Sequence, residues 1–331
     1  MFSKYFLSLI FTLLFFVSFG ALAQEKPVLN IYTYDSFAAD WGPGPKLKEK
    51  FEQNCNCTIN LIAASNSISS LRKIQLEGEQ TKADILLGID TSIAAQALET
   101  GLFIKHEIDV SDINIPNAWS SDYFVPFDYG YFAFVYNKEK LKNPPTSFAD
   151  LIKQDIKIIV QDPRSSTPGL GLVLWIKSIY KEQAKNIWSE LKPKIVTMTK
   201  GWSESYNLFL KGEADMVLSY TTSPAYHKIV ENDNRFEFAQ FEKGHYLQIE
   251  VGAIVKSSKN QALAKQFLVW LISEEAQEII PTTNWMYPVA NIELPKGFME
   301  QAKPKKALLI DEVIVFENSE AWVLEMLDAF K

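Results

Sequence analysis

The sequence predicts an α/β protein of two lobes, each built on a mainly parallel sheet flanked by helices. Short β-rich runs alternate with amphipathic helical segments along the chain, which is the pattern of parallel sheets covered by helices. The chain has 331 residues, and even without a short N-terminal signal it is long enough for two domains of ordinary size. Residues 82–90 (KADILLGID) also resemble residues 213–221 (EADMVLSYT), as two similar lobes would.

Residues 1–23 predict a secretory signal peptide. Lys4 precedes a nearly unbroken apolar run, which ends in Ala21-Leu22-Ala23 before a polar segment. A basic start, an apolar middle and an A-x-A end are typical of such signals. The apolar run is shorter than the roughly 20 residues that a membrane span needs. We therefore expect export, with cleavage after Ala23.

The first part of the mature chain predicts alternating strands and helices. β-rich composition and helical spacing place them, in chain order, at a strand 28–33, a helix 45–54, a strand 58–63, a helix 69–79 and a strand 83–88. Apolar strands of this length between amphipathic helices are typical of a parallel sheet.

Two longer β-rich stretches, residues 131–136 and 246–255, predict where the chain crosses between the lobes. The segment between them again alternates strands with helices, so the domain boundary is discontinuous. The expected units are a first lobe of residues 24–130 and 251–303, a second lobe of residues 131–250, and a helical tail of residues 304–331.

Charge and motif content narrow the function. The formal net charge is −7 and no long basic run occurs, so nucleic acid and anionic membranes are poor partners. The three histidines lie far apart, and no HExxH, G-x-S-x-G or phosphate-loop motif occurs, so no catalytic or metal site is predicted. Cys55 and Cys57 form a C-x-C pair, for which a local disulfide, idle thiols and a catalytic thiol all remain open.

Two hydroxyl-rich turns predict an anion site. Residues 161–171 (QDPRSSTPGLG) contain Ser166 and Thr167 and lead into a helical run expected to begin near Gly171. Residues 219–227 (SYTTSPAYH) repeat this chemistry after another apolar strand. Helix starts offer free N–H groups and a positive dipole end, so the two turns can converge on one anion. Ordinary helix capping is the alternative.

Aromatic residues lie beside these polar turns and predict a site for an organic cation. They occur in Gly-, Pro- and Ser-rich segments and include Tyr34, Trp41, Trp202, Tyr220, Tyr226 and Trp285. Ring faces attract organic cations, so the group suits a flat cationic ring with a phosphate tail. Core packing is the alternative for any single member.

Five stretches resemble the periplasmic thiamine-binding proteins of bacterial ABC transporters. They are residues 32–45 (YTYDSFAADWGPGP), 125–145 (VPFDYGYFAFVYNKEKLKNPP), 161–172, 199–227 and 282–291 (TTNWMYPVAN). The resemblance implies the two-lobed periplasmic binding protein fold of type II, with the ligand cleft between the lobes. It implies a periplasmic receptor, without cofactor or enzymatic activity, that captures thiamine and its mono- and diphosphate. The expected partners are a membrane permease and its separate ATPase, and the receptor is expected to be a monomer.

The same resemblance assigns ligand-binding residues. Ser166 and Thr167 fall on positions for the phosphate end of the ligand. The full expected set is Tyr34, Trp41, Asn66, Ser67, Ser166, Thr167, Trp202, Tyr220, Thr221, Thr222, Ser223, Tyr226 and Trp285. Asn66-Ser67 stands where this family has Asp-Gly. Asparagine keeps the ability of aspartate to form hydrogen bonds but lacks its charge. Asp35, Asp90 and Asp128 are the candidates to replace that charge.

Two alternative functions remain open at this stage. The first is a thiaminase-like enzyme on a related fold, for which Cys55 or Cys57 would be the nucleophile. The second is a receptor for another solute such as ferric iron. Iron sites of this fold use adjacent tyrosines, and the separation of Tyr220 from Tyr226 counts against that alternative.

Overall fold

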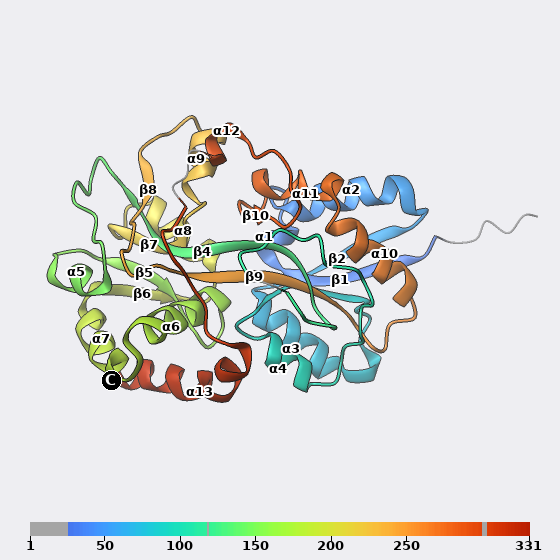
Figure 1. The fold of residues 1–331 in the computed structure, drawn as a ribbon, viewed down its shortest axis with the longest axis horizontal. Helices are drawn as coiled ribbons and strands as arrows, with labels where there is room; N and C mark the ends of the chain where they lie inside the picture. Colours follow the sequence, from blue (N-terminus) through green and yellow to red (C-terminus); the bar gives the residue numbers. More distant parts are fainter. Residues whose placement is uncertain (1–25, 118, 300–302) are drawn as a thin grey trace, which may run out of the picture.

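A continuous mixed β-sheet runs through the molecule (Figure 1). The computed structural model describes residues 26–117, 119–299 and 303–331, so the predicted signal peptide lies outside the described residues. The strands are β1 (Val28–Tyr34), β2 (Thr58–Ala64), β3 (Ile85–Asp90), β4 (Val125–Asn137), β5 (Ile158–Gln161), β6 (Ile195–Thr199), β7 (Met216–Tyr220), β8 (Phe236–Phe238), β9 (His245–Ile254), β10 (Tyr287–Pro288) and β11 (Ala307–Leu308). Their order is β2-β1-β3-β9-β4-β7-β5-β6; in addition, β8 and β10 pair with β4, and β11 pairs with β9.

Helices cover the sheet and form its connections. The α-helices are α1 (Asp35–Ala38), α2 (Pro43–Cys55), α3 (Ser67–Glu77), α4 (Ala94–Glu99), α5 (Phe148–Lys153), α6 (Thr167–Tyr180), α7 (Ala184–Leu191), α8 (Trp202–Leu210), α9 (Pro224–Val230), α10 (Gln261–Leu271), α11 (Glu274–Gln277), α12 (Lys296–Met299) and α13 (Glu312–Ala329). Short 3-10 turns are η1 (Gly78–Gln80), η2 (Lys181–Gln183), η3 (Lys192–Lys194) and η4 (Ile280–Thr282).

The first half of the sheet consists of parallel strands with helices on both faces. β1 pairs in parallel with β2 along its whole length and with β3 through Ile31 and Tyr32. In Figure 1, α2 and α10 lie above these strands, and α3 and α4 lie below them. β1 and β3 are mostly or wholly buried, because a sheet covered on both faces has no solvent side. Every strand and helix boundary predicted in this part agrees with the structure to within two residues.

The second half repeats this arrangement, with one difference from the prediction. β5 pairs in parallel with β6 and β7, and α6 begins at Thr167 and not near Gly171. The glycines of this segment lie inside the helix, at the places where it contacts the sheet. A Cβ at Gly169 would lie 2.5 Å from the carbonyl oxygen of Gln161, and one at Gly171 would lie 2.0 Å from the Phe132 ring. They let α6 pack closely against the sheet.

Two long antiparallel strands connect the halves. β4 pairs with β9 over residues 125–131 and with β7 and β8 over residues 132–137. β9 pairs with β3 on its other side. Figure 1 shows both strands running across the centre of the molecule. Almost every residue of these strands is buried, so they are the structural link between the two halves.

The C-terminal helix α13 packs against both halves of the molecule. It contacts α6 and α7 of the second half and α4 of the first. Val315 and Met326 are buried, and Glu325 pairs with the buried Lys177 of α6 at 3.0 Å. The side chain of Asp311 caps the helix by accepting from the first-turn N–H groups. α13 thus joins the two halves at a second place, apart from β4 and β9.

Cys55 and Cys57 form a disulfide at the C-terminal end of α2. Within the described residues no cysteine is free. Of the three alternatives for the C-x-C pair, the local disulfide is therefore correct, and the two alternatives with free thiols, idle or catalytic, are wrong. Across the same residues, no helix combines the length and the apolar composition needed to cross a bilayer.

Candidate functional site

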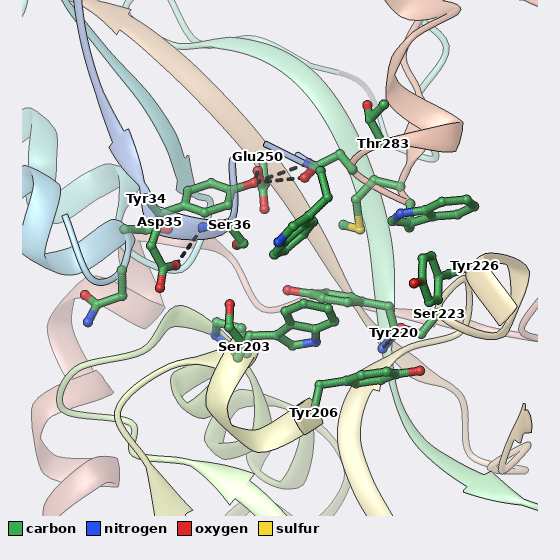
Figure 2. Close-up of a pocket in the computed structure, with 18 of the residues that line it drawn as sticks. Tyr34, Asp35, Ser36, Ser203, Tyr206, Tyr220, Ser223, Tyr226, Glu250 and Thr283 are labelled. Carbon is green, nitrogen blue, oxygen red and sulfur yellow. Dashed lines mark hydrogen bonds between the residues drawn. The ribbon is translucent and has the colours of Figure 1, made fainter. Parts of the chain in front are cut away.

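A cavity of about 510 Å³ is lined by residues from both halves of the sheet (Figure 2). Its volume is typical of small-molecule sites. The predicted site residues that line it are Tyr34, Trp41, Asn66, Ser67, Ser166, Thr167, Trp202, Tyr220, Ser223, Tyr226 and Trp285. Two other predicted residues, Thr221 and Thr222, are fully buried and are not part of its wall.

The cavity lies at the carboxyl ends of parallel strands. Tyr34 ends β1, and Ser67 begins α3 after β2. Thr167 begins α6 after β5, and Trp202 begins α8 after β6. Open α/β sheets bind ligands at this edge. Because these helices start at the cavity wall, the positive ends of their dipoles lie there too.

The starts of α6 and α3 differ in how their hydroxyl and amide groups are used. The N-cap Ser166 makes no side-chain capping hydrogen bond, so its hydroxyl is not committed to that role. The Oδ1 atom of Asn66 accepts from the N–H of Ser69 at 2.8 Å, and its Nδ2 donates to Ser65 Oγ at 3.2 Å. Asn66 thus caps α3 while lining the cavity.

The second hydroxyl-rich turn contributes less to the cavity than the sequence analysis expected. Ser223 lines it, with its Oγ atom 2.7 Å from Ser219 Oγ. The N–H of Thr221 donates to the carbonyl oxygen of Tyr131 on β4 at 2.9 Å, which extends the pairing of β7 with β4 by one residue. Thr221 and Thr222 therefore lie in the protein interior, both at 0% exposure.

A stacked pair of rings, held by a hydrogen-bonded chain, forms one wall. Trp202 stacks on Tyr206 with ring centroids 5.0 Å apart and an interplanar angle of 25°, and its Nε1 donates to Ser219 Oγ at 2.8 Å. Behind it, the Tyr206 hydroxyl lies 2.9 Å from His227 Nε2, and His227 Nδ1 lies 2.6 Å from a Glu231 carboxylate oxygen. These contacts fix the orientation of the Trp202 ring.

Other aromatic side chains surround the same space. Tyr220 stacks on Phe132 at 5.2 Å, and Tyr226 meets Trp285 edge to face at 5.3 Å. Trp41 is 56% exposed and so lies at the rim. Trp285 has φ of +58°, an uncommon conformation for a large side chain that is typical of functional sites.

One buried carboxyl group lines the cavity, and two others are its neighbours in the sheet. Glu250 lines it and accepts from the Tyr34 hydroxyl at 2.8 Å. Asn284 donates to an oxygen of the neighbouring Asp128 at 2.6 Å. Burial raises the pKa of Asp90 and Asp128 and raises the pKa of Glu250 well above the ordinary carboxyl range. Each of these groups therefore gains from a nearby positive charge.

The charges of the wall favour a cation. Asp35 and Glu250 line the cavity, whereas no lysine, arginine or histidine does so among the described residues. Aromatic faces and carboxylates both attract an organic cation, and the contact is worth about 2 kcal/mol when the pair is desolvated. The helix starts are the features of this wall that favour an anion.

Sequence reasoning missed several lining residues. Glu250, Asn284 and Tyr206 were not among the predicted site residues, yet all three line the cavity. A lone acidic residue inside the apolar strand 246–255 was the available signal for Glu250, because a charge in a buried strand needs a partner. No sequence pattern distinguished Asn284 or Tyr206 from ordinary loop and helix residues.

The chain is similar to known solute-binding proteins. Residues 36–278 match the family described as bacterial extracellular solute-binding protein. The chain is 52% identical over 302 residues to the thiamine-binding periplasmic protein of Escherichia coli, covering 91% of this chain and 92% of that protein. It is 41% identical over 321 residues to the protein of the same name from Haemophilus influenzae, with 96% of each covered. A solved periplasmic thiamin binding protein superimposes with a TM-score of 0.91 at 50% identity, covering 93% of this chain and 98% of that one.

Proposed function

The chain belongs to the bacterial extracellular solute-binding proteins, within the group of thiamine-binding periplasmic proteins, and on this premise we propose that it is a receptor that captures thiamine for uptake. The observation that carries the proposal is a cavity with indole and phenol walls, a buried carboxylate and no basic side chain in its described lining. Thiamine has a flat thiazolium cation, which such a cavity attracts.

The predicted ligand-binding residues take distinct roles in this proposal. The rings of Trp202, Tyr220 and Trp285 enclose the cationic heterocycle, and Glu250 lies near its charge. The start of α6 at Ser166 and Thr167 receives the phosphate of thiamine mono- or diphosphate, since free N–H groups and the helix dipole favour an anion. When unphosphorylated thiamine is bound, its hydroxyl group and water would occupy this end of the cavity.

The proposed mechanism is closure of two lobes around the ligand. Residues 24–130 and 251–303 form one lobe, residues 131–250 form the other, and residues 304–331 form a tail across them. β4 and β9 connect the lobes, so small changes along these strands would open and close the cavity. Closure excludes water and strengthens each electrostatic contact. The closed monomer would then deliver the ligand to a membrane permease driven by a separate ATPase.

Export completes the proposal. Cleavage after Ala23 would release the mature receptor into the periplasm, where an oxidising environment is consistent with the Cys55–Cys57 disulfide. Both alternatives are weaker. The thiaminase-like alternative needs a thiolate, and both candidate sulfurs are paired and do not line the cavity. Ferric iron is the weaker reading because Tyr220 and Tyr226 are not adjacent in the chain, and, among the described residues, no group of three or more histidine, cysteine, aspartate or glutamate side chains is placed to hold a metal.

Native mass spectrometry of the freshly purified protein tests the proposal directly. We expect a bound mass equal to that of thiamine or one of its phosphates. Calorimetric titration with thiamine should give a dissociation constant below about 1 μM, which corresponds to a binding free energy of about 8 kcal/mol in favour of the complex. No binding of thiamine or its phosphates would refute the assignment. Incubation with thiamine and an amine nucleophile should release no cleaved pyrimidine, and turnover would show an enzyme instead.

A further inference from the structure

Three carboxyl groups stand side by side on adjacent strands beneath the cavity. Glu250 of β9 is the direct register partner of Asp90 on β3 and of Asp128 on β4. We call these three residues the acid row. They are 6%, 1% and 0% exposed respectively. Side chains at directly paired positions are only about 4.5–5.5 Å apart at Cβ, and like charges there repel.

The neighbours of the acid row are neutral or acidic. Glu250 is contacted by the Tyr34 hydroxyl from β1 and by the Gln248 amide on its own strand, and Asn284 bonds Asp128. The other titratable groups acting on the row are Tyr220 of β7, Tyr246 of β9 and Glu312 of α13. Within the described residues, the salt bridges formed by lysine, arginine and histidine leave the acid row out.

Two oxygens of the acid row lack a well-formed hydrogen bond, although Thr167 at the start of α6 lies near Asp90 and acts against the rise of its pKa. Asp128 Oδ1 and Asp90 Oδ2 are buried without such a hydrogen bond to any described residue. Burying one unpaired carboxylate is costly, and burying three at directly paired strand positions is far more so. The empty protein meets this cost most simply by keeping a proton on the row. Because Asp128 and Glu250 are direct register partners on neighbouring strands, these two groups are the ones whose titrations are coupled most directly.

We propose that the Asp128–Glu250 pair holds a proton in the empty receptor and releases it when the cationic ligand enters, so that capture exchanges one proton for one organic cation. This inference rests on the proposed function. The carboxylic O–H bond breaks, its electron pair stays on the carboxylate oxygen, and the proton passes to water or buffer. The thiazolium replaces it as the positive charge near the row, so the net charge of the site is unchanged.

The exchange makes binding depend on pH in a defined direction. The bound state favours the ionised pair, whereas the empty state favours the protonated pair. Binding therefore tightens as pH rises toward the pKa of the empty pair, by up to about tenfold per pH unit for one proton released. The dependence disappears above that pKa, where the empty pair has already lost its proton. A neutral ligand of the same shape gains nothing from the exchange.

Calorimetry in buffers of different ionisation enthalpy measures the proton directly. Between about pH 6 and pH 7 we expect close to one proton released per thiamine bound, and an affinity that rises about tenfold over this unit. The matched ligand is an analogue in which the thiazolium nitrogen is replaced by carbon, so that the ring is neutral while the aminopyrimidine is kept. It should bind at least about tenfold more weakly and release no proton.

Variants locate the proton on the pair. Glu250→Gln should remove most of the proton release and flatten the pH dependence, whereas the exposed Glu190→Gln on α7 should behave as the unmodified protein. If Glu250→Gln does not fold, the neutral analogue on the unmodified receptor still decides the question. Thiamine binding without proton release, or equal release with the neutral analogue, would overturn this inference alone. Absence of thiamine binding would overturn the proposed function as well.

Discussion

Replacing Trp202 by alanine tests the aromatic wall of the cavity most directly. The indole lines the cavity, stacks on Tyr206 and is held by a hydrogen bond to Ser219. Its orientation is therefore fixed before the ligand arrives, and little ordering cost is left for binding. Removing the ring leaves one face of the proposed thiazolium site open to water.

The expected loss follows from the contacts that the ring offers. A desolvated cation on an indole face gains about 2 kcal/mol, and stacking of a heterocycle on an aromatic side chain is worth about 1–3 kcal/mol. These two contributions overlap, so we expect Trp202→Ala to cost about 2–3 kcal/mol, or roughly 30- to 150-fold in the dissociation constant. Trp202→Phe keeps a ring face and loses the Nε1 donor, which costs about 1 kcal/mol, or roughly fivefold.

Isothermal titration with thiamine measures these losses, and thermal unfolding checks that each variant is folded. The matched control is Trp270→Ala. Trp270 donates its Nε1 to Glu275 at 3.0 Å and packs on Phe51, and it does not line the cavity. Its replacement should lower stability and leave the affinity within about twofold. An affinity of Trp202→Ala equal to that of the control would remove Trp202 from the site.

Further outcomes test stability, pH response and the disulfide. Burial raises the pKa of Glu250, and a carboxyl group of raised pKa lowers the stability of the protein as pH rises above the pKa of the unfolded state. Glu250→Gln should therefore raise the free energy of unfolding of the ligand-free protein at pH 7 by about 1–3 kcal/mol, measured by denaturant titration. Unchanged or lower stability would contradict this. His245 is buried, and burial lowers its pKa to about 4, so stability should fall by about 3 kcal/mol from pH 6.5 to pH 4 through this residue; an NMR titration showing a charged ring at pH 5 would disprove it. Replacing Cys55 and Cys57 by serine opens a very short loop and should cost only about 1–2 kcal/mol of stability without weakening thiamine binding; loss of binding in the folded variant would place the disulfide in the site.

The fold was predictable where local patterns decide it. β1, β2 and β3 are short apolar strands between amphipathic helices, and their positions follow from composition alone. The start of α6 was misplaced because glycine usually marks a helix end or turn. Here Gly169 and Gly171 lie inside the helix because it packs closely against Gln161 and Phe132. Such a contact between distant segments leaves no mark on the local sequence.

The same distinction applies to the candidate site. Aromatic and hydroxyl residues at strand ends were predictable, since parallel strands bring their carboxyl ends to one edge. Thr221 and Thr222 looked equivalent to Ser223 in sequence, but both are buried, and Thr221 pairs with β4. Asp90 and Asp128 were named as candidates for charge compensation. Glu250 was missed, because its role depends on which residues stand opposite it.

The register of the acid row is consistent with the proposed proton exchange. β3 and β4 each carry one extra residue next to this position, at the irregularities between Leu87 and Ile89 and between Pro126 and Asp128. In regular ladders, Ile89 and Phe127 would stand opposite Glu250, and the acids would lie one position further on.

The two irregularities instead bring a carboxyl group to each side of Glu250. One of them needs Gly88, which has φ of +92° and leaves no room for a Cβ against the Tyr34 ring. Apolar neighbours for Glu250 would have been the simpler solution for folding, and they were available one residue away on both strands. A chain that uses two β-bulges to place three carboxyl groups together has an arrangement that costs stability when empty. In the proposed exchange a bound cation would remove that cost, so the same irregularities that weaken the empty protein would strengthen its hold on the ligand.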